Sequence, residues 1–270
     1  MIYLKFWTKR YLIVEFALLA TLLSGCSHIG ATDAEVNIIY RRSAQYHQPD
    51  RNPVIVIPGL MGSRLVDIDS GQTVWGAFDA KAADPQTDEG ARLMSLTISD
   101  DKDLSSLKDN IEPDGVLDKI KIKLFGIPLV VRAYAGILAT LGVGGYRDQD
   151  LGLNSIDYGD DHFTCFQFDY DWRLSNVDNA QRLKVFIDEK REYVRAAYKA
   201  RYDLDVDDIK FDIVAHSMGG LIARYFLRYG DTKLDEIRDE DPVPWLGKSD
   251  IGRLILVAPP MVDRWMHLPG

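Results

Sequence analysis

The sequence predicts an α/β protein built around a mostly parallel β-sheet. Residues 54–57 are four consecutive β-branched residues that end at Pro58 and Gly59, which is typical of a strand buried on both faces. The other candidate elements alternate along the chain, with strands at 163–168, 209–214 and 253–257 and helices at 175–202 and 221–229. This alternation indicates a parallel sheet covered by helices.

Local patterns support each of these later elements. In the helix at 175–202, apolar residues recur at near-helical spacing, and Ser175 is a suitable N-cap. The strand at 209–214 runs into a turn of small residues, from which the helix at 221–229 leaves. Residues 231–250 are highly charged and are expected to form a loop before the last strand.

Composition excludes several classes of protein. The chain has 270 residues, of which 46% are hydrophobic and 27% charged, so it is neither wholly disordered nor a multi-span membrane protein. Its net charge of -9 repels phosphate backbones, and we expect no nucleic-acid partner. Two cysteines cannot build a zinc cluster, and the acidic runs lack the alternating ligands of a calcium loop. We therefore expect no metal and no cofactor.

The N-terminus has the pattern of a secretory signal. Three cations precede a mostly apolar stretch at residues 11–23, which is shorter than the roughly 20 residues that span a membrane. The sequence Leu-Ser-Gly-Cys at residues 23–26 resembles a bacterial lipobox, which implies a signal peptide over residues 1–25 and lipid attachment at Cys26. An uncleaved signal anchor, or a secretory signal with a chance cysteine, remains the alternative.

The lipobox implies a bacterial cell-envelope protein that contacts the membrane through its lipid anchor. Because Ser27 rather than Asp follows the cysteine, we expect the outer membrane. Residues 26–52 form an expected tether and residues 53–270 the folded domain, in which 64–160 is an expected cap or substrate-binding insertion. The apolar stretch at 127–141 predicts a helix, either buried in the core or lying against lipid.

The most specific chemical motif is Val-Ala-His-Ser-Met-Gly-Gly at residues 214–220. It resembles the nucleophile elbow of α/β hydrolases, with Ala215 in place of the first glycine. Such a turn exposes a serine hydroxyl at a helix N-terminus, which makes Ser217 the expected catalytic nucleophile and the Met218 backbone N–H one oxyanion donor. His216 is expected to point elsewhere and to serve in packing or hydrogen bonding.

A second motif, Pro-Gly-Leu-Met-Gly-Ser at residues 58–63, follows the first central strand. In hydrolases of this fold, the loop at this place supplies the second oxyanion donor. Glycines let its backbone approach the substrate closely. We assign the donor to the Leu60 N–H, with the Met61 N–H as second choice.

A third motif, Tyr-Asp-Trp-Arg at residues 170–173, closes the strand at 163–168. Together with residues 58–63 and 215–220, it resembles the lecithin:cholesterol acyltransferase-like family of lipases. The resemblance covers residues 53–258 and implies an α/β-hydrolase fold and acyl-ester hydrolysis or acyl transfer on lipids.

Not every residue near these motifs is expected to be catalytic. For Asp171 and Arg173, a structural ion pair at the sheet edge is favoured over contact with substrate. Trp172 is expected to pack, and Cys165 to be a buried, inert thiol.

The acid and histidine of a catalytic triad should follow the serine. The candidate carboxylates after Ser217 are Asp231, Asp235, Glu236, Asp239, Glu240, Asp241, Asp250 and Asp263. His267 is the only histidine after Ser217, and we expect that it forms no working catalytic pair with Asp263. The last strands of the fold are apparently missing, so the sequence reads as C-terminally truncated, with an exposed apolar sheet edge.

Three functions compete at this point. The leading hypothesis is a lipid-acting serine acyl hydrolase or O-acyltransferase, of lipase or phospholipase type, with a lipid or acyl-ester substrate and an acyl-enzyme on Ser217. The alternative is a catalytically inactive remnant or lipid-binding lipoprotein that lacks the acid and histidine of the triad. A peptidase or small-ester hydrolase of the same fold is the third.

Overall fold

The structure is a computed structural model that describes residues 49–76, 87–95, 109–117, 120–124, 127–131, 134–160, 162–238 and 242–260. The expected signal peptide, Cys26 and most of the expected tether lie outside these residues, as do Asp263 and His267. No helix in the described ranges is long and apolar enough to cross a membrane.

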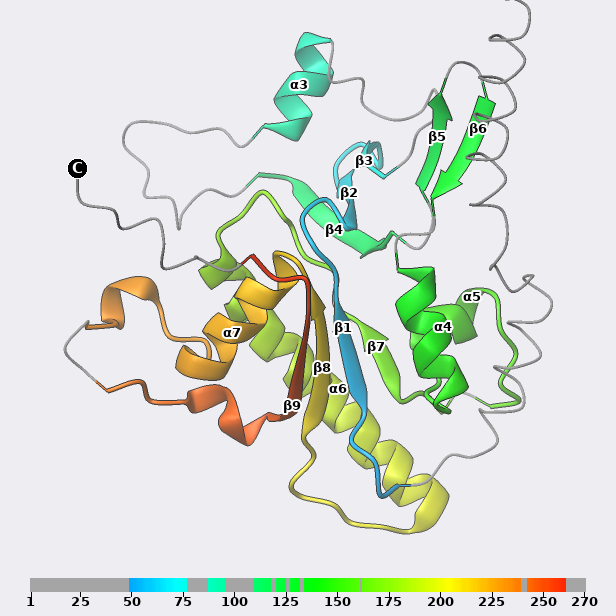
Figure 1. Ribbon diagram of the computed structural model, residues 1–270, viewed down its shortest axis with the longest axis vertical. Helices are drawn as coiled ribbons and strands as arrows, with labels where there is room; N and C mark the ends of the chain where they lie inside the picture. Colours follow the sequence, from blue (N-terminus) through cyan, green and yellow to red (C-terminus); the bar gives the residue numbers. More distant parts are fainter. Residues whose placement is uncertain are drawn as a thin grey trace, which may run out of the picture. The chain divides into compact units, whose positions relative to one another are not determined.

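The central sheet has four parallel strands in the order β7-β1-β8-β9 (Figure 1). These strands are β1 (Val54–Ile57), β7 (Cys165–Gln167), β8 (Phe211–His216) and β9 (Ile251–Val257). Every residue of β1 is buried, as its run of β-branched residues predicts. The α/β class with a mostly parallel central sheet is therefore confirmed.

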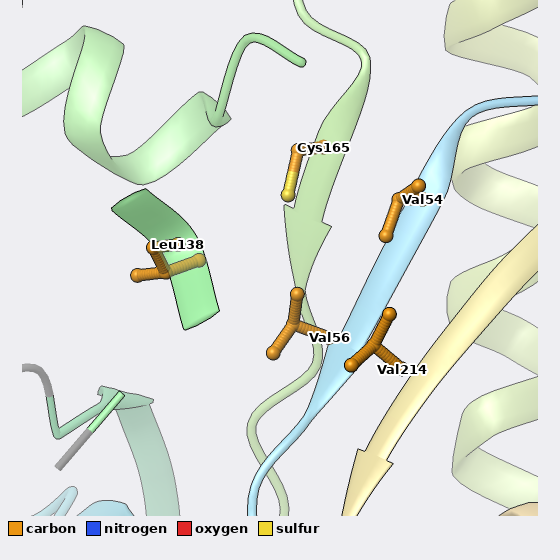
Figure 2. Close-up of a cluster of buried hydrophobic side chains, with 5 residues drawn as sticks. All are labelled: Val54, Val56, Leu138, Cys165 and Val214. Carbon is orange, nitrogen blue, oxygen red and sulfur yellow. The ribbon is translucent and has the colours of Figure 1, made fainter. Parts of the chain in front are cut away.

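Helices cover both faces of this sheet. Cys165 and the alternate residues Val54 and Val56 pack against Leu138 of α4 (Ala135–Val143), as Figure 2 shows. On the other face, the Phe166 ring lies 5.7 Å from that of Tyr193. Tyr193 belongs to the long helix α6, which packs against α7. Successive strand residues point to opposite faces, so β1 and β7 are covered on both sides.

The two long helix candidates form as predicted. Helix α6 (Asn176–Tyr202) begins after Ser175, whose hydroxyl accepts a hydrogen bond from the Asp178 backbone N–H at 3.1 Å. It ends at Asp203, which adopts a left-handed conformation with φ of 51°. Helix α7 (Gly219–Tyr229) starts directly after the turn that closes β8. The expected N-cap and the strand-turn-helix unit are both present.

A second, antiparallel sheet has the order β3-β2-β4. Its strands are β2 (Ser63–Asp67), β3 (Thr73–Trp75) and β4 (Ile111–Val116), and the short helix α3 (Asp88–Met94) packs beside them. Leu65, Val74, Leu93 and Ile111 form its small core. Because β2 starts at Ser63, this sheet continues directly from the second motif.

The helix expected over residues 127–141 is wrong for 127–131 and confirmed for 135–141. Residues Ile127–Val131 form strand β6, which pairs antiparallel with β5 (Ile120–Leu124), and helix α4 begins only at Ala135. Pro128 disfavours helical geometry at the residue before it, and the β-branched Val130 and Val131 favour a strand. A further short helix, α5 (Gln149–Asn154), precedes β7.

The last described part of the chain contains two short 3-10 turns, η2 (Leu234–Glu236) and η3 (Leu246–Ser249), where a loop was expected. Strand β9 then forms one edge of the central sheet and pairs with β8. Within the described ranges, β9 has no second neighbour, and Ile255 is 49% exposed. This arrangement agrees with the expected exposed apolar edge.

Candidate active site

Ser217 occupies a strained turn between β8 and α7. Its φ angle is 50°, in the left-handed region that side-chain-bearing residues rarely adopt. The Ser217 N–H donates to the Val257 carbonyl at 2.9 Å, and its own carbonyl accepts from the Gly220 N–H at 3.0 Å. Ser217 is half-buried, so the turn places it at the end of the sheet and not inside the core.

The small residues around Ser217 are required by close contacts. A Cβ atom on Gly219 would lie 2.3 Å from the Pro58 carbonyl oxygen and 2.7 Å from a methyl group of Ile57. On Gly220 it would lie 3.0 Å from Pro259. Ala215 is fully buried beside Ile57 in the register of β8 and β1. The turn therefore packs directly against the end of β1, as the motif predicts.

Residues 58–63 fold into a tight turn after β1. The Gly62 N–H donates to the Gly59 carbonyl at 3.0 Å, and Met61 has a φ angle of 61°, as the third residue of a type II turn requires. The Trp75 indole N–H donates to the Met61 carbonyl at 2.9 Å. Leu60 and Met61 are both exposed.

The two turns touch each other. A Cβ atom on Gly59 would lie 2.9 Å from Ser217 Cβ and 2.9 Å from His216 Nδ1. Neither the Leu60 N–H nor the Met218 N–H donates a hydrogen bond to another residue in the described ranges. The structure thus brings Gly59, which precedes Leu60, against Ser217, and the oxyanion roles of the Leu60 and Met218 N–H groups stay predictions.

Tyr134 links the two turns. Its hydroxyl accepts a hydrogen bond from the Gly59 N–H at 2.7 Å and lies 3.2 Å from His216 Nδ1. The Tyr134 and His216 rings meet edge to face, with centroids 5.7 Å apart. Burial raises the pKa of Tyr134, and the Gly59 hydrogen bond opposes that rise. His216 is thus a hydrogen-bonding residue, as expected.

The third motif, residues 170–173, hydrogen bonds to the turn at residues 58–63. The Tyr170 hydroxyl donates to the Pro58 carbonyl at 3.0 Å, and the Tyr170 N–H donates to the Ser63 hydroxyl at 3.0 Å. The Trp172 indole N–H donates to the Ser63 carbonyl at 3.3 Å. Burial, together with the charge that Tyr134 carries when ionised, raises the pKa of Tyr170, so its hydroxyl stays a donor. The role of this motif is to brace the backbone around Leu60.

Asp171 and Arg173 form the expected structural ion pair. Their charged atoms lie 2.7 Å apart, and the side chains are 2% and 3% exposed. Arg173 also pairs with Asp109 at 2.9 Å, which ties the beginning of β4 to the end of β7. Burial alone would lower the pKa of Arg173, but its hydrogen bonds with Asp171 and Asp109 outweigh burial and raise it.

The described residues supply no hydrogen-bonded acid or histidine partner for the Ser217 hydroxyl. Within the described ranges, the Ser217 hydroxyl makes no hydrogen bond to a histidine. Asp250 pairs with Arg191 at the start of β9, whereas Ser217 lies at the end of β8. Asp231, Asp235 and Glu236 follow the C-terminal end of α7, the end away from Ser217. The remaining candidates, namely Asp239, Glu240, Asp241, Asp263 and His267, lie outside the described residues.

Sequence reasoning missed Tyr134 and Trp75. Both reach the turn at residues 58–63 from elements of the 64–160 segment, and no local pattern marks either residue. Cys165 is a buried free thiol, as predicted. The part of the chain that the structure describes holds no cluster of His, Cys, Asp or Glu suited to a metal ion.

Known proteins are similar to this chain over the region that contains these motifs. Residues 152–263, which contain the third motif and the elbow, match the family described as Lecithin:cholesterol acyltransferase. The protein named Lecithin-cholesterol acyltransferase-like 4 from Arabidopsis thaliana is 26% identical over 217 residues, which cover 74% of this chain and 34% of that protein.

A solved structure, that of the Tle4-Tli4 complex, aligns with a TM-score of 0.38 and 20% identity, over 67% of this chain and 43% of that one. The chain spans about a third of the length of the plant relative that it matches. The matched residues and this relative support the resemblance of the chain to the lecithin:cholesterol acyltransferase-like family.

Proposed function

We propose that the protein is a lipid-acting serine acyl hydrolase or O-acyltransferase that forms an acyl-enzyme on Ser217. The observation that carries this proposal is the half-exposed serine at a φ angle of 50°, with the Gly59 backbone packed against it. The similarity to the lecithin:cholesterol acyltransferase-like family supports an acyl ester of a lipid as the substrate.

In the proposed reaction, Ser217 Oγ bonds to the ester carbonyl carbon while a base removes the hydroxyl proton. The carbonyl oxygen becomes an oxyanion, which the Leu60 and Met218 N–H groups stabilise; one such donor is worth about 2.7–4 kcal/mol in other enzymes. The ester C–O bond then breaks, and the base returns the proton to the departing alcohol. Water or an acceptor alcohol next attacks the acyl-enzyme, giving hydrolysis or acyl transfer respectively.

A fluorophosphonate probe tests this proposal because it phosphonylates only an activated serine. We expect the wild-type chain to be labelled on Ser217 and the Ser217→Ala variant to stay unlabelled. Ser155→Ala is a matched control, since Ser155 is exposed and hydrogen bonds only to the Leu151 carbonyl of its own helix. Labelling that persists in Ser217→Ala, or its absence from folded wild-type protein, would exclude the proposal.

A catalytically inactive remnant or lipid-binding lipoprotein is the second candidate. It is favoured by one observation, that no histidine in the described ranges hydrogen bonds to Ser217. The same probe separates the two candidates, because a serine without a base reacts slowly. A folded wild-type chain that binds acyl-lipid vesicles but resists the probe would support this second function.

We further propose that the protein is anchored to the bacterial outer membrane by a lipid on Cys26. The support is the order of the N-terminal cations, the apolar stretch and the Leu-Ser-Gly-Cys sequence. A single acyl chain binds membranes only marginally, so the anchor requires more than one chain. Metabolic labelling with an alkyne palmitate should mark wild-type protein and fail in Cys26→Ser.

A further inference from the structure

The Tyr134 hydroxyl lies between the two glycines of the turn at residues 58–63. It accepts the Gly59 N–H at 2.7 Å, and a Cβ atom on Gly62 would lie 2.8 Å from it. Tyr134 is 5% exposed and stands at the start of α4, far along the chain from the turn. A residue from the 64–160 segment therefore sets the position of the backbone that precedes Leu60.

The same hydroxyl reaches the second turn. The Tyr134 oxygen lies 3.2 Å from His216 Nδ1, and the tautomer of the imidazole decides which of the two groups donates. His216 immediately precedes Ser217, so one phenol joins the backbone of the oxyanion turn to a side chain of the elbow.

We propose that Tyr134 is a positioning residue that clamps the oxyanion turn to the nucleophile elbow. The inference rests on the proposed function, because a fixed oxyanion turn matters only if Ser217 reacts with an acyl ester. Oxyanion donors help only when they are held where the negative charge develops. The Gly59–Leu60 peptide follows directly from the clamped N–H, so the clamp holds the Leu60 N–H next to Ser217.

Amide exchange tests the clamp without any need for enzymatic activity. In Tyr134→Phe the Gly59 N–H loses its acceptor, and we expect it to exchange at least about tenfold faster with solvent deuterium, as measured by NMR on glycine-labelled protein. Tyr158→Phe is the matched control, because the Tyr158 hydroxyl also accepts a backbone N–H, that of Asp148 at 3.1 Å, and Tyr158 is also buried. Unchanged Gly59 exchange in folded Tyr134→Phe would overturn the clamp.

The rate of fluorophosphonate labelling tests whether the clamp by Tyr134 helps Ser217 to react. We expect Tyr134→Phe to be labelled about tenfold more slowly than wild type, which corresponds to about 1.4 kcal/mol of transition-state stabilisation. Tyr158→Phe should be labelled at the wild-type rate, although it loses a similar amount of thermal stability. Equal rates for Tyr134→Phe and wild type would refute the positioning role. An unlabelled wild type would refute the proposed function, and the Gly59 exchange would still decide the clamp.

A pair of His216 variants keeps the inference testable if Tyr134→Phe does not fold. His216→Asn retains a side chain that can hydrogen bond near the place of Nδ1, whereas His216→Leu removes that ability. We expect faster Gly59 exchange in His216→Leu, and near wild-type exchange in His216→Asn. Equal exchange in the two variants would overturn the clamp.

Discussion

Gly219→Ala is the substitution that tests the contact between the elbow and β1 most severely. The new Cβ atom would lie 2.3 Å from the Pro58 carbonyl oxygen, whereas real Cβ atoms essentially never come within 3.0 Å of another heavy atom. The two backbones must therefore separate by about 0.7 Å, the difference between these distances. Neither side can swing away, because Tyr170 holds the Pro58 carbonyl and β8 is central in its sheet.

Overpacking a rigid site costs about 1–3 kcal/mol, and backbone clashes lie at the upper end, so we expect a loss of about 3 kcal/mol in the free energy of unfolding. Such a loss raises the unfolded fraction by about two orders of magnitude. Urea unfolding followed by tryptophan fluorescence measures it. The shift also moves Pro58 relative to Ser217, so labelling by fluorophosphonate should fall in the protein that remains folded.

Gly136→Ala is the control for this substitution. Gly136 lies in α4, and a Cβ atom there would meet nothing within 4 Å. We expect stability between the wild-type value and a gain of about 1 kcal/mol, because alanine favours helix over glycine. A Gly219→Ala protein as stable as Gly136→Ala would show that the elbow does not touch β1, and the site geometry would be wrong.

The remaining predictions concern ion pairs, pH and the anchor. Arg173→Met leaves Asp171 buried without its main partner and should lower the free energy of unfolding in urea by about 3–5 kcal/mol. Arg253→Met removes a mostly exposed arginine and should lower it by less than about 1 kcal/mol. Equal losses in the two variants would contradict the buried pair. Burial, with Arg201 and Arg147 nearby, lowers the pKa of His162 to about 4. The unfolded chain then binds a proton that the folded chain does not between about pH 6.5 and 4, so stability should fall by up to about 1.4 kcal/mol per pH unit as pH drops through this window. His162→Gln should flatten that slope, and an unchanged slope would assign it to other groups. Cys26→Ser should move the protein from the membrane fraction to the soluble fraction after cell breakage, and an unchanged distribution would exclude the lipid anchor.

Much of the central sheet can be predicted because its evidence is local. The β-branched run of β1 and the strand-turn-helix unit of β8 and α7 each carry their pattern in one short continuous stretch of sequence. The turns that follow β1 and β8 carry glycines or alanine where a larger side chain would clash, and these small residues predict the two turns that form the candidate site. Element ends are less exact, and β7 covers only Cys165–Gln167 of the longer stretch expected.

The 64–160 segment is where sequence reasoning fails, because its structure depends on contacts between distant residues. An apolar run such as 127–141 fits a buried helix and a strand equally well by composition alone. Only pairing with β5 decides its first part, and only packing against Val54 and Val56 decides the second. Tyr134 reaches Gly59 across 75 positions of sequence, and no periodicity carries information over that distance.

The ion pair of Asp171 and Arg173 shows how the same motif serves folding and function. Its residues do not touch Ser217 in the hydrogen-bond network; they hold the end of β7, from which Tyr170 and Trp172 support residues 58 and 63. The motif thus contributes rigidity to the backbone around the candidate site. Preorganised donors require such support, because a loose turn would lose the advantage of fixed oxyanion donors.

The most direct measurement of the central claim is a crystal structure of the fluorophosphonate-treated chain. The account predicts a phosphoryl group on Ser217 Oγ, with its oxygen accepting hydrogen bonds from the Leu60 and Met218 N–H groups at about 2.7–3.1 Å. A phosphoryl group on another serine, or one on Ser217 whose oxygen points into solvent away from residues 58–63, would contradict it.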